Sequence, residues 1–569
     1  MFTSSTSTAA IMITSTNISE SEKMGYGISI DVGTSGTRMH AVDLSDNKII
    51  STAITVRHPV PGANVMDHLT FCIEVDREIA HKLLIDTANK LMKMLEIDLN
   101  KVERVAICGN PIQLSMFQNM EIRDLAYVGE NTLKSKGVEL QKRDARLISA
   151  KELGLELPEG VMVMVPPAIK HEIGADALAM MYQTKLLEQE GNVLVTDYGT
   201  NAEMALKVGD EILTGSAAAG PAIEGQSIKA GMLASPGAIS DVNSDGYWRC
   251  TVLDDSINTQ EGDKVEPNTG NVVEEGPMHG KALGVTGTGV IAAIAVAMEY
   301  GLIKWPHITT VDNMLHLQDG ITLTEHDVLE AAKTFGAMRA GHFTLLQHAG
   351  LKIEDLDIMY MSGASGTYVD ALKAQRVGLL PPTPKKIYQF GNTSLAMATD
   401  LVKDPELLEK LQKLANSIRA NHIMFATDPI FEKVFVQELA YWQEGMPMEV
   451  YNMMLEMAEI QPLPAEIKPA EVIRVVKRDI PDLGSKGLKV LRDIGVHISG
   501  SFEGCTGCEA CLRECPERAI KVTQGGKSGF QIEVASDLCN GTACMRCERI
   551  CPEKVFKFKE LHKGLKETA

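Results

Sequence analysis

Eight of the eleven cysteines lie in the last part of the chain, at spacings that suit metal binding. They form two runs, each of three close cysteines and a fourth followed by proline: Cys505-x2-Cys508-x2-Cys511-x3-Cys515 and Cys539-x4-Cys544-x2-Cys547-x3-Cys551. In proteins with two such runs, the first three thiolates of a run bind one iron–sulfur cluster, and the fourth binds the other cluster. We therefore predict two [4Fe-4S] clusters, held by two crossed sets of ligands: Cys505, Cys508, Cys511 and Cys551, and Cys515, Cys539, Cys544 and Cys547.

The second run departs from this pattern, because residues 540–543 stand where two residues are usual. We interpret them as a looser loop that leaves Cys539 the least secure ligand. Structural zinc is an alternative, since thiolates at this spacing also suit a tetrahedral ion, but the duplicated run ending in Cys-Pro favours iron–sulfur. Disulfides are less expected, because Cys72, Cys108 and Cys250 are scattered and no export signal is evident. We expect a reducing, cytoplasmic compartment.

Size and charge exclude several classes of function. At 569 residues and 61.8 kDa the chain must hold several cores, of which the cysteine region is only the last. The formal charge of -20 argues against a nucleic-acid-binding surface, which is usually basic. No apolar run reaches the about 18 residues that a membrane span needs. Residues 1–23 are rich in Ser and Thr and lack a basic start, so we predict a disordered extension and no signal peptide.

A glycine turn near the start of the chain offers a different chemistry. The stretch 26–37 predicts an apolar strand that delivers Asp31 into a turn, and residues 38–44 predict the second strand of a hairpin. Glycine lets backbone N–H groups approach phosphate oxygens, hydroxyls can donate to them, and a carboxylate suits hydrated Mg²⁺. The candidate phosphate-binding residues of this turn are Gly33, Thr34, Ser35 and Thr37.

The same arrangement occurs again further along the chain. An apolar strand over 193–197 ends in Asp197, a Gly-Thr turn follows, and residues 204–208 predict another strand. This repetition indicates an internal duplication, with two similar lobes facing each other across a nucleotide. A third glycine turn follows the predicted strand 357–361, where an adenosine could lie against bare backbone. The candidate residues of these two turns are Gly199, Thr200 and Asn201, and Gly363, Ala364 and Gly366.

Other segments carry weaker signals. Gly287-Thr-Gly289-Val-Ile-Ala292 could suggest a dinucleotide-binding turn, but no clear βαβ unit precedes it, so we predict a helix N-terminus with a packed helix over 290–300. His58 and His68 lie in one loop at a spacing that matches no common ligand set, and we interpret them as satisfied surface histidines instead of metal ligands. Amphipathic patterns predict further helices over 73–95 and 324–350.

The glycine turns resemble the motifs of a known superfamily. The Asp-x-Gly-Thr turns at Asp31 and Asp197 and the turn Ser362-Gly-Ala-Ser-Gly366 are similar to the phosphate-1, phosphate-2 and adenosine motifs of actin, Hsp70 and sugar kinases. More specifically, the segments 197–203 and 220–225 and the adenosine-type turn resemble ATP-dependent reductive activators of corrinoid proteins. The pair of [4Fe-4S] motifs at the C-terminal end resembles the archaeal branch that serves methylamine methyltransferases. Only the first 23 residues stand outside the similarity.

The resemblance implies a fold, a set of roles and a partner. The fold is α/β, with a duplicated actin-like ATPase core and a C-terminal α+β ferredoxin domain. Asp31 and Asp197 would handle Mg²⁺ and the attacking water, Thr34, Ser35 and Thr200 the phosphates, and residues 363–366 the adenosine. The implied function is ATP-dependent reduction of Co(II) to Co(I) in the corrinoid protein of a methylamine methyltransferase system. A low-potential donor would supply the electrons through the two clusters.

The same reasoning divides the chain and leaves alternatives. The predicted parts are an extension (1–23), a first lobe (24–190), a second lobe (191–458), a stiff proline-containing linker (459–495) and a cluster-binding domain (496–569).

The chain lacks Asp-x-His-x-x-Gly, so we expect the cobalt in the partner, and it lacks a Gly-x4-Gly-Lys-Ser/Thr nucleotide motif. Two alternatives are an ATP-driven activator of 2-hydroxyacyl-CoA dehydratase-type enzymes, which the eight cysteines disfavour, and a non-catalytic nucleotide-binding redox scaffold.

Overall fold

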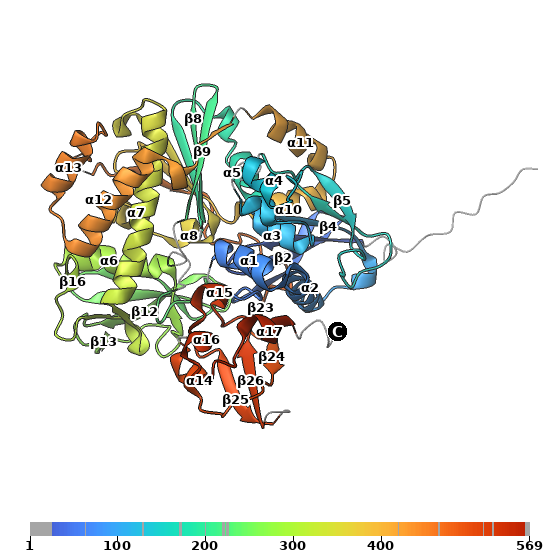
Figure 1. Ribbon diagram of the computed structural model, residues 1–569. Helices are drawn as coiled ribbons and strands as arrows, with labels where there is room; N and C mark the ends of the chain where they lie inside the picture. Colours follow the sequence, from blue (N-terminus) through green and yellow to red (C-terminus); the bar gives the residue numbers. More distant parts are fainter. Residues whose placement is uncertain are drawn as a thin grey trace, which may run out of the picture.

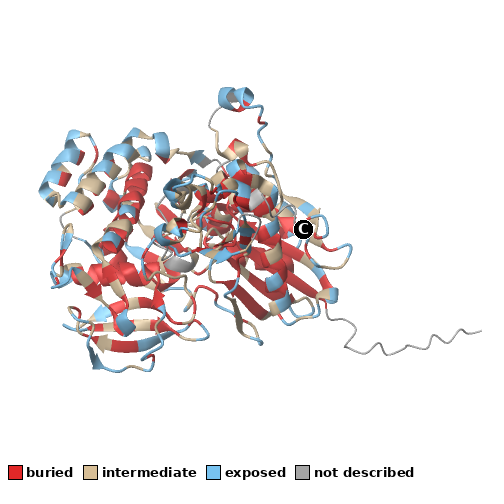
Figure 2. Ribbon diagram, turned by 60° about the horizontal axis from the view of Figure 1, so that its bottom comes forward, coloured by how far each residue is buried: buried red, intermediate tan, exposed pale blue. Residues whose placement is uncertain are grey.

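Two seven-stranded sheets, a five-stranded sheet and a three-stranded sheet organise the described part of the chain (Figure 1). The computed structural model describes residues 25–62, 64–127, 130–169, 173–199, 201–218, 222, 227–418, 420–464, 467–515, 517–525 and 529–563. The predicted extension 1–23 lies outside these residues. Buried positions gather along the strands of the sheets and on the helices that pack against them (Figure 2).

The first lobe is built on a seven-stranded sheet with strand order β23-β3-β2-β1-β4-β6-β5. Strands β1, β2 and β3 form an antiparallel meander, and β4 joins β1 in parallel. Every residue of β1 is buried, as expected for a central strand covered on both faces. The bounds are β1 Tyr26–Val32, β2 Thr37–Asp43, β3 Lys48–Thr55, β4 Val102–Gly109, β5 Arg146–Ser149, β6 Met162–Val165 and β23 Leu488–Leu491.

The second lobe repeats this plan in the order β21-β9-β8-β7-β19-β20-β22. Strands β7, β8 and β9 form the antiparallel meander, and β19 and β20 continue the sheet in parallel. The shared central topology confirms the predicted internal duplication. The bounds are β7 Val193–Tyr198, β8 Asn201–Val208, β9 Glu211–Ala218, β19 Ile358–Ser362, β20 Lys386–Gln389, β21 Ala420–His422 and β22 Glu471–Arg474.

The helices of the first lobe begin earlier than the sequence pattern predicted. Helical structure begins at residue 65, where the side chain of Asn64 accepts hydrogen bonds from the N–H groups of Met66 and Asp67. A π-helical turn follows, and Asp76, whose backbone is extended, caps a second helix that ends at residue 94. The bounds are α1 Val65–Phe71, the π-helical turn η2 Cys72–Asp76, α2 Arg77–Met94, α3 Pro111–Phe117, α4 Glu130–Ser135 and α5 Ala175–Gln183.

Two later segments of the chain also belong to the first lobe in space. Helix α10, Thr393–Lys403, contacts β1 and β4, and Thr399 Oγ1 lies 2.8 Å from Ser29 Oγ. Helix α11, Leu407–Ser417, follows it. The segment 459–495, predicted as a stiff linker, contributes β22 to the second sheet and β23 to the first, because its short apolar stretches beyond the prolines find sheet edges to pair with.

The rest of the second lobe packs helices over a smaller sheet. The Gly287 to Ala292 stretch opens helix α6, as predicted: Thr286 caps it, and a Cβ at Gly289 would lie 2.4 Å from the Ile239 carbonyl oxygen. Helix α7 pairs with α12 through a buried ion pair between Arg339 and Glu438, 3.0 Å apart. The bounds are β10 Ala238–Ser244, β11 Trp248–Leu253, β12 Thr259–Val265, β13 Val272–Glu274, β14 Gly284–Val285, β15 Ile303–Lys304, β16 His307–Ile308, β17 Met314–His316, β18 Thr322–Thr324, α6 Gly287–Glu299, α7 Glu325–His348, α8 Gly363–Tyr368, α9 Ala371–Arg376, α12 Pro429–Glu444 and α13 Met448–Met457.

The cluster domain, residues 496–563, lies below the first lobe in Figure 1 and shares one hydrophobic core with it. Its sheet has the order β24-β26-β25. Helix α17 contacts η2, and α15 contacts α1. Among the described residues, no helix is both long and apolar enough to span a membrane. The bounds are β24 His497–Gly500, β25 Ile520–Gln524, β26 Phe530–Ala535, α14 Ala510–Glu514, α15 Gly541–Cys544, α16 Arg546–Ile550 and α17 Phe558–Lys563.

Candidate cluster sites and nucleotide cleft

The eight C-terminal cysteines gather around two separate cavities. Each cavity combines three cysteines of one run with the Cys-Pro cysteine of the other run. Cys505, Cys508, Cys511 and Cys551 line one cavity, and Cys515, Cys539, Cys544 and Cys547 line the second. The fold thus produces the two crossed sets that the spacing predicted.

Apolar side chains of one hairpin line both cavities. Val522 and Ile532 line the first cavity, whereas Ile520 and Val534 line the second, and these residues pair across β25 and β26. Four soft thiolates in an apolar pocket are the donor set that a [4Fe-4S] cluster requires, so the residues fit this group. Burial raises the pKa of Cys539 to about 12 when no metal is bound, and a bound metal would take the thiol as thiolate.

Cys539, predicted as the least secure ligand, is held in place by its surroundings. The backbone N–H of Gly541 donates to its Sγ at 3.4 Å, and the carbonyl oxygen of Cys539 accepts from the N–H of Gly62 at 2.9 Å. Most of the four-residue spacing between Cys539 and Cys544 lies in α15, which contacts α1 of the first lobe. The longer spacing therefore serves as a contact between domains.

A cavity of about 90 Å³ lies between the two lobes, where the glycine turns meet. Asp31 comes from the end of β1, and Asp197 comes from β7 of the other lobe. Seven of the predicted residues line this cavity: Asp31, Gly33, Thr34, Asp197, Gly199, Asn201 and Gly363. The duplication thus places one carboxylate from each lobe beside the same space.

Several polar side chains that were not predicted surround Asp31. Asn392 Nδ2 donates to Asp31 Oδ2 at 2.6 Å, and Arg38 Nη1 lies 3.8 Å from the same oxygen. Burial, with a smaller contribution from the Asp31 charge, raises the pKa of Asp176 to about 6. Arg38, Asn110, Asp176, Glu203, Asn392 and Ser394 all line the cavity.

Gly363 holds the third turn against Asp197. Parallel pairing of β7 and β19 puts Ser362 next to Asp197, and Gly363 follows with φ +85, a conformation that favours glycine. A Cβ at this position would lie 2.2 Å from Asp197 Oδ1. The close approach explains why glycine is needed here. The segment is the beginning of helix α8 and not an isolated turn.

The remaining predicted residues have other positions. Ser35 and Thr37 are buried, and the Thr37 N–H donates to Thr55 Oγ1 at 2.8 Å, so this residue supports the turn from behind. Gly366 lies within α8, where its carbonyl oxygen accepts from Gln389 Nε2 at 3.0 Å. Thr200 lies outside the described residues, as does the side chain of Ala364.

His58 and His68 are buried and not on the surface, so that prediction was wrong. Their rings stack with centroids 4.0 Å apart, and Gln113 bonds to both. A polar loop composition indicates exposure, but the buried amide of Gln113 gives each ring one hydrogen-bond partner.

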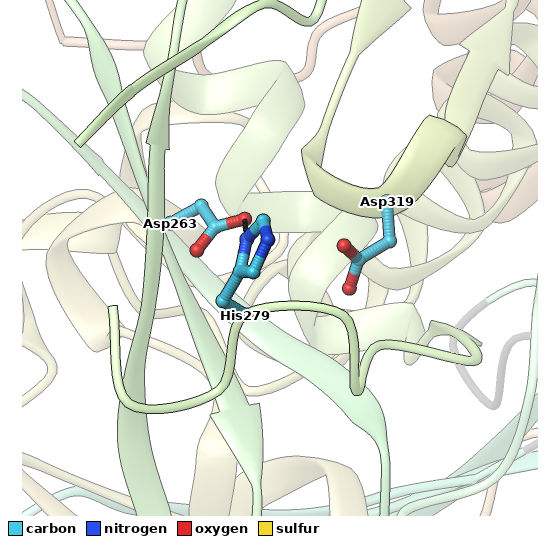
Figure 3. A group of neighbouring side chains, drawn as sticks. All are labelled: Asp263, His279 and Asp319. Carbon is cyan, nitrogen blue, oxygen red and sulfur yellow. Dashed lines mark hydrogen bonds and ion pairs between the residues drawn. The ribbon is translucent and has the colours of Figure 1, made fainter. Parts of the chain in front are cut away.

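A second group of potential ligands lies in the second lobe, with Asp263 on β12, His279 in a loop and Asp319 in the 3-10 turn Gln318–Gly320 (Figure 3). Asp263, His279 and Asp319 each place a ligand atom within 4.8 Å of the others. His279 Nδ1 donates to Asp263 at 2.8 Å, and Asp319 accepts from the backbone N–H groups of Gly280 and Ala282. These contacts fasten the turn 276–282 to its neighbours, which is a sufficient role for the three side chains.

Family models and relatives match this arrangement. The models are "RACo middle region" over residues 26–189, "C-terminal domain of RACo the ASKHA domain" over 191–452, and "4Fe-4S dicluster domain" over 504–563. The chain is 49% identical over 521 residues to the "[Co(II) methylated amine-specific corrinoid protein] reductase" of Methanosarcina barkeri, covering 91% of this chain and 95% of that protein. The chain belongs to the family of corrinoid protein reductive activators.

Other members of the reductive activator group are more distant. "Corrinoid activation enzyme RamQ" of Eubacterium limosum is 24% identical over 467 residues, covering 75% of this chain and 72% of that protein. A solved structure titled "Reductive activator for corrinoid,iron-sulfur protein" has a TM-score of 0.61 at 22% identity, covering 73% of this chain and 66% of that one. The matches confirm the predicted actin-like core and the C-terminal iron–sulfur domain of this reductive activator.

Proposed function

We propose that this chain uses ATP and Mg²⁺ to drive the reduction of Co(II) to Co(I) in the corrinoid protein of a methylamine methyltransferase system. The observation that carries the proposal is the joint presence of two complete cysteine sets and an interlobe cleft bearing Asp31 and Asp197. The 49% identity to a reductase named for such a protein supports the choice of substrate. A low-potential donor would supply the electrons.

The residues of the cleft suit nucleotide hydrolysis. Asp31 and Asp197 face it from opposite lobes, so they can hold hydrated Mg²⁺ and orient the attacking water between them. Gly33, Gly199 and Gly363 leave the backbone open to phosphate oxygens. When bound, the two clusters supply one-electron transfer, and the eight cysteines hold them.

The energetics explain why ATP is needed. An electron moved uphill costs about 2.3 kcal/mol for each 100 mV. A two-state change driven by about 5.5 kcal/mol of differential nucleotide binding could therefore offset roughly 240 mV. Closure of the two lobes on the nucleotide is the two-state change that the duplicated fold permits.

The test follows the cobalt directly. The reconstituted protein, a strong reductant and a Co(II) methylamine corrinoid protein are mixed without oxygen, and visible spectra are recorded with and without ATP. We expect Co(I) to appear only with ATP. Appearance of Co(I) at the same rate without ATP, or no Co(I) with both clusters intact, would refute the proposal.

A pair of carboxylate variants ties the effect to the cleft. Asp197→Ala should abolish ATP-dependent Co(I) formation while the iron content stays that of the parent protein. Asp210→Ala removes an exposed carboxylate from the β8 to β9 turn of the same lobe and should leave the reaction unchanged. Equal activity of the two variants would contradict the role assigned to Asp197.

A further inference from the structure

A buried amide and two histidines lie between the nucleotide cleft and the cluster domain. Gln113 is fully buried in α3, with its Oε1 3.0 Å from His58 Nε2 and its Nε2 2.8 Å from His68 Nδ1. The N–H of Val60 donates to His58 Nδ1 at 3.2 Å. Burial lowers the pKa of His58 to about 4 and holds that of His68 well below 6.5, so both rings are neutral.

These contacts connect both rings to one amide. When His58 Nδ1 accepts from the Val60 N–H, its Nε2 donates to the amide oxygen of Gln113, and the amide nitrogen donates to His68 Nδ1. The Val60 carbonyl oxygen also lies 3.4 Å from His58 Nδ1, so the other tautomer, with the Gln113 amide turned over, keeps both contacts. A displacement of Gln113 would disturb its contacts to both buried rings at once, so the three side chains behave as one unit.

One end of this unit reaches the nucleotide cleft. Asn110 caps α3, because its Oδ1 accepts from the N–H of Gln113 at 2.9 Å. The same side chain donates through Nδ2 to Thr34 Oγ1 at 3.0 Å. Asn110 and Thr34 both line the cleft. The Thr34 hydroxyl can donate to a phosphate while its oxygen still accepts from Asn110, so a phosphate there is linked through one hydroxyl to the residue that caps α3.

The other end supports the cluster domain. Two hydrogen bonds join loop 58–62 to the cluster domain. Ser536 Oγ donates to the carbonyl oxygen of Pro59 at 2.9 Å, and the N–H of Gly62 donates to the carbonyl oxygen of Cys539 at 2.9 Å. Gly541 packs so closely that a Cβ there would lie 3.0 Å from the Pro61 carbonyl oxygen. Cys539 itself lines the second cluster cavity.

Space beside this contact allows it to move. A cavity of about 380 Å³ is lined by His58 and Gly62 of the first lobe, by Lys229 of the second lobe, and by Cys539 and Asn540 of the cluster domain. A shift of loop 58–62 can be taken up there without opening the shared hydrophobic core on the other side.

We propose that Gln113, His58 and His68 are positioning residues, which make the placement of Cys539 depend on whether a phosphate engages Thr34. This inference rests on the proposed ATP-dependent function, and it adds the route by which the nucleotide reaches the cluster. The chain of contacts from Thr34 through Asn110, Gln113, His58 and loop 58–62 to Cys539 is continuous and buried along most of its length, as transmission of a small shift requires.

Hydrogen exchange of the reconstituted full chain tests the route. Backbone exchange is compared with and without a non-hydrolysable ATP analogue and Mg²⁺. In the parent protein we expect slower exchange in the peptide 31–37 and a change of about threefold or more in the peptide 536–544. Gln113→Met, which keeps the side-chain length but removes the amide, should keep the first response and lose the second.

The control variant weakens the same interface away from the route. Lys559 forms an exposed ion pair with Glu74 at 2.9 Å, and Lys559→Ala should preserve both responses. Ser536→Ala, which removes only the bond to Pro59, gives a milder break at the cluster end and should reduce the response at 536–544. ATP-dependent Co(I) formation should fall about tenfold in Gln113→Met while ATP hydrolysis changes little.

The outcomes separate the two proposals. Absence of any nucleotide response at 31–37 in the parent protein would refute the nucleotide site itself. A response at 31–37 without one at 536–544 would refute the route alone. If Gln113→Met retains the parent response at 536–544, the three side chains are merely structural. If that variant fails to incorporate iron, Ser536→Ala and the parent protein still decide the question.

Discussion

Replacement of Gly363 by alanine should cripple ATP turnover by moving one carboxylate. The backbone at Gly363 has φ +85, and a new Cβ would meet Asp197 Oδ1 at 2.2 Å. Since ordinary contact begins near 3.4 Å, the carboxylate must withdraw by about 1.2 Å. A misplacement of roughly 1 Å in a catalytic site can cost about 100-fold in rate, equivalent to about 2.7 kcal/mol of transition-state stabilisation.

Gly350→Ala is the matched control for this change. Gly350 has φ +66, and a Cβ there would meet no atom within 4 Å. Both variants carry the left-handed strain of roughly 1–2 kcal/mol, which denaturant titration should show in each. Only Gly363→Ala should lose ATP hydrolysis, measured as phosphate release without oxygen. If the two variants hydrolyse ATP at the same rate, Asp197 does not act from the position that the structure gives it.

Three further predictions concern the clusters, the core and pH. Cys551→Ala removes one ligand of the Cys505 set, so iron should fall from about 8 to about 4 atoms per chain; unchanged iron would show that Cys551 is not a ligand. Glu438→Ala removes the carboxylate that pairs with the buried Arg339 guanidinium. It should lower the free energy of unfolding, measured by denaturant titration, by about 3–5 kcal/mol, whereas a decrease below about 1 kcal/mol would mean that water reaches this pair. Hydrogen bonding to Asp263 raises the pKa of His279 above 6.5, so this contact should stabilise the fold below pH 6.5 and weaken as pH rises through the raised value. His279→Gln should reduce the pH dependence of the unfolding midpoint over that range. If the variant and the parent protein have the same pH dependence, the contact is not linked to folding.

The cysteine sets could be predicted because their chemistry is local. Four thiols in one run and a proline after the last specify both the ligands and the crossing. Asp31 and Asp197 were predictable for the same reason, since a strand that ends in a carboxylate before a glycine turn is a short-range pattern. The sequence therefore indicated both kinds of site before any tertiary contact was considered.

Residues that the fold brings to the cleft from elsewhere could not be predicted. Asn392 reaches Asp31 from a segment more than half the chain away, and nothing around it distinguishes it from an ordinary helix cap. Arg38 follows the first turn directly, yet its role beside Asp31 depends on how β2 pairs with β1. His58 was misjudged because a polar loop usually lies in water, and only the tertiary structure reveals the amide that accompanies it.

The return of α10 to the first lobe has a consequence for how this protein can be divided. A gene fragment that stops at residue 189, where the first family model ends, would encode β1 and β4 without the helix that covers them. It would also lack β23, which completes one edge of that sheet. We therefore expect such a fragment to aggregate when expressed alone, and to become soluble when residues 390–495 are supplied in trans.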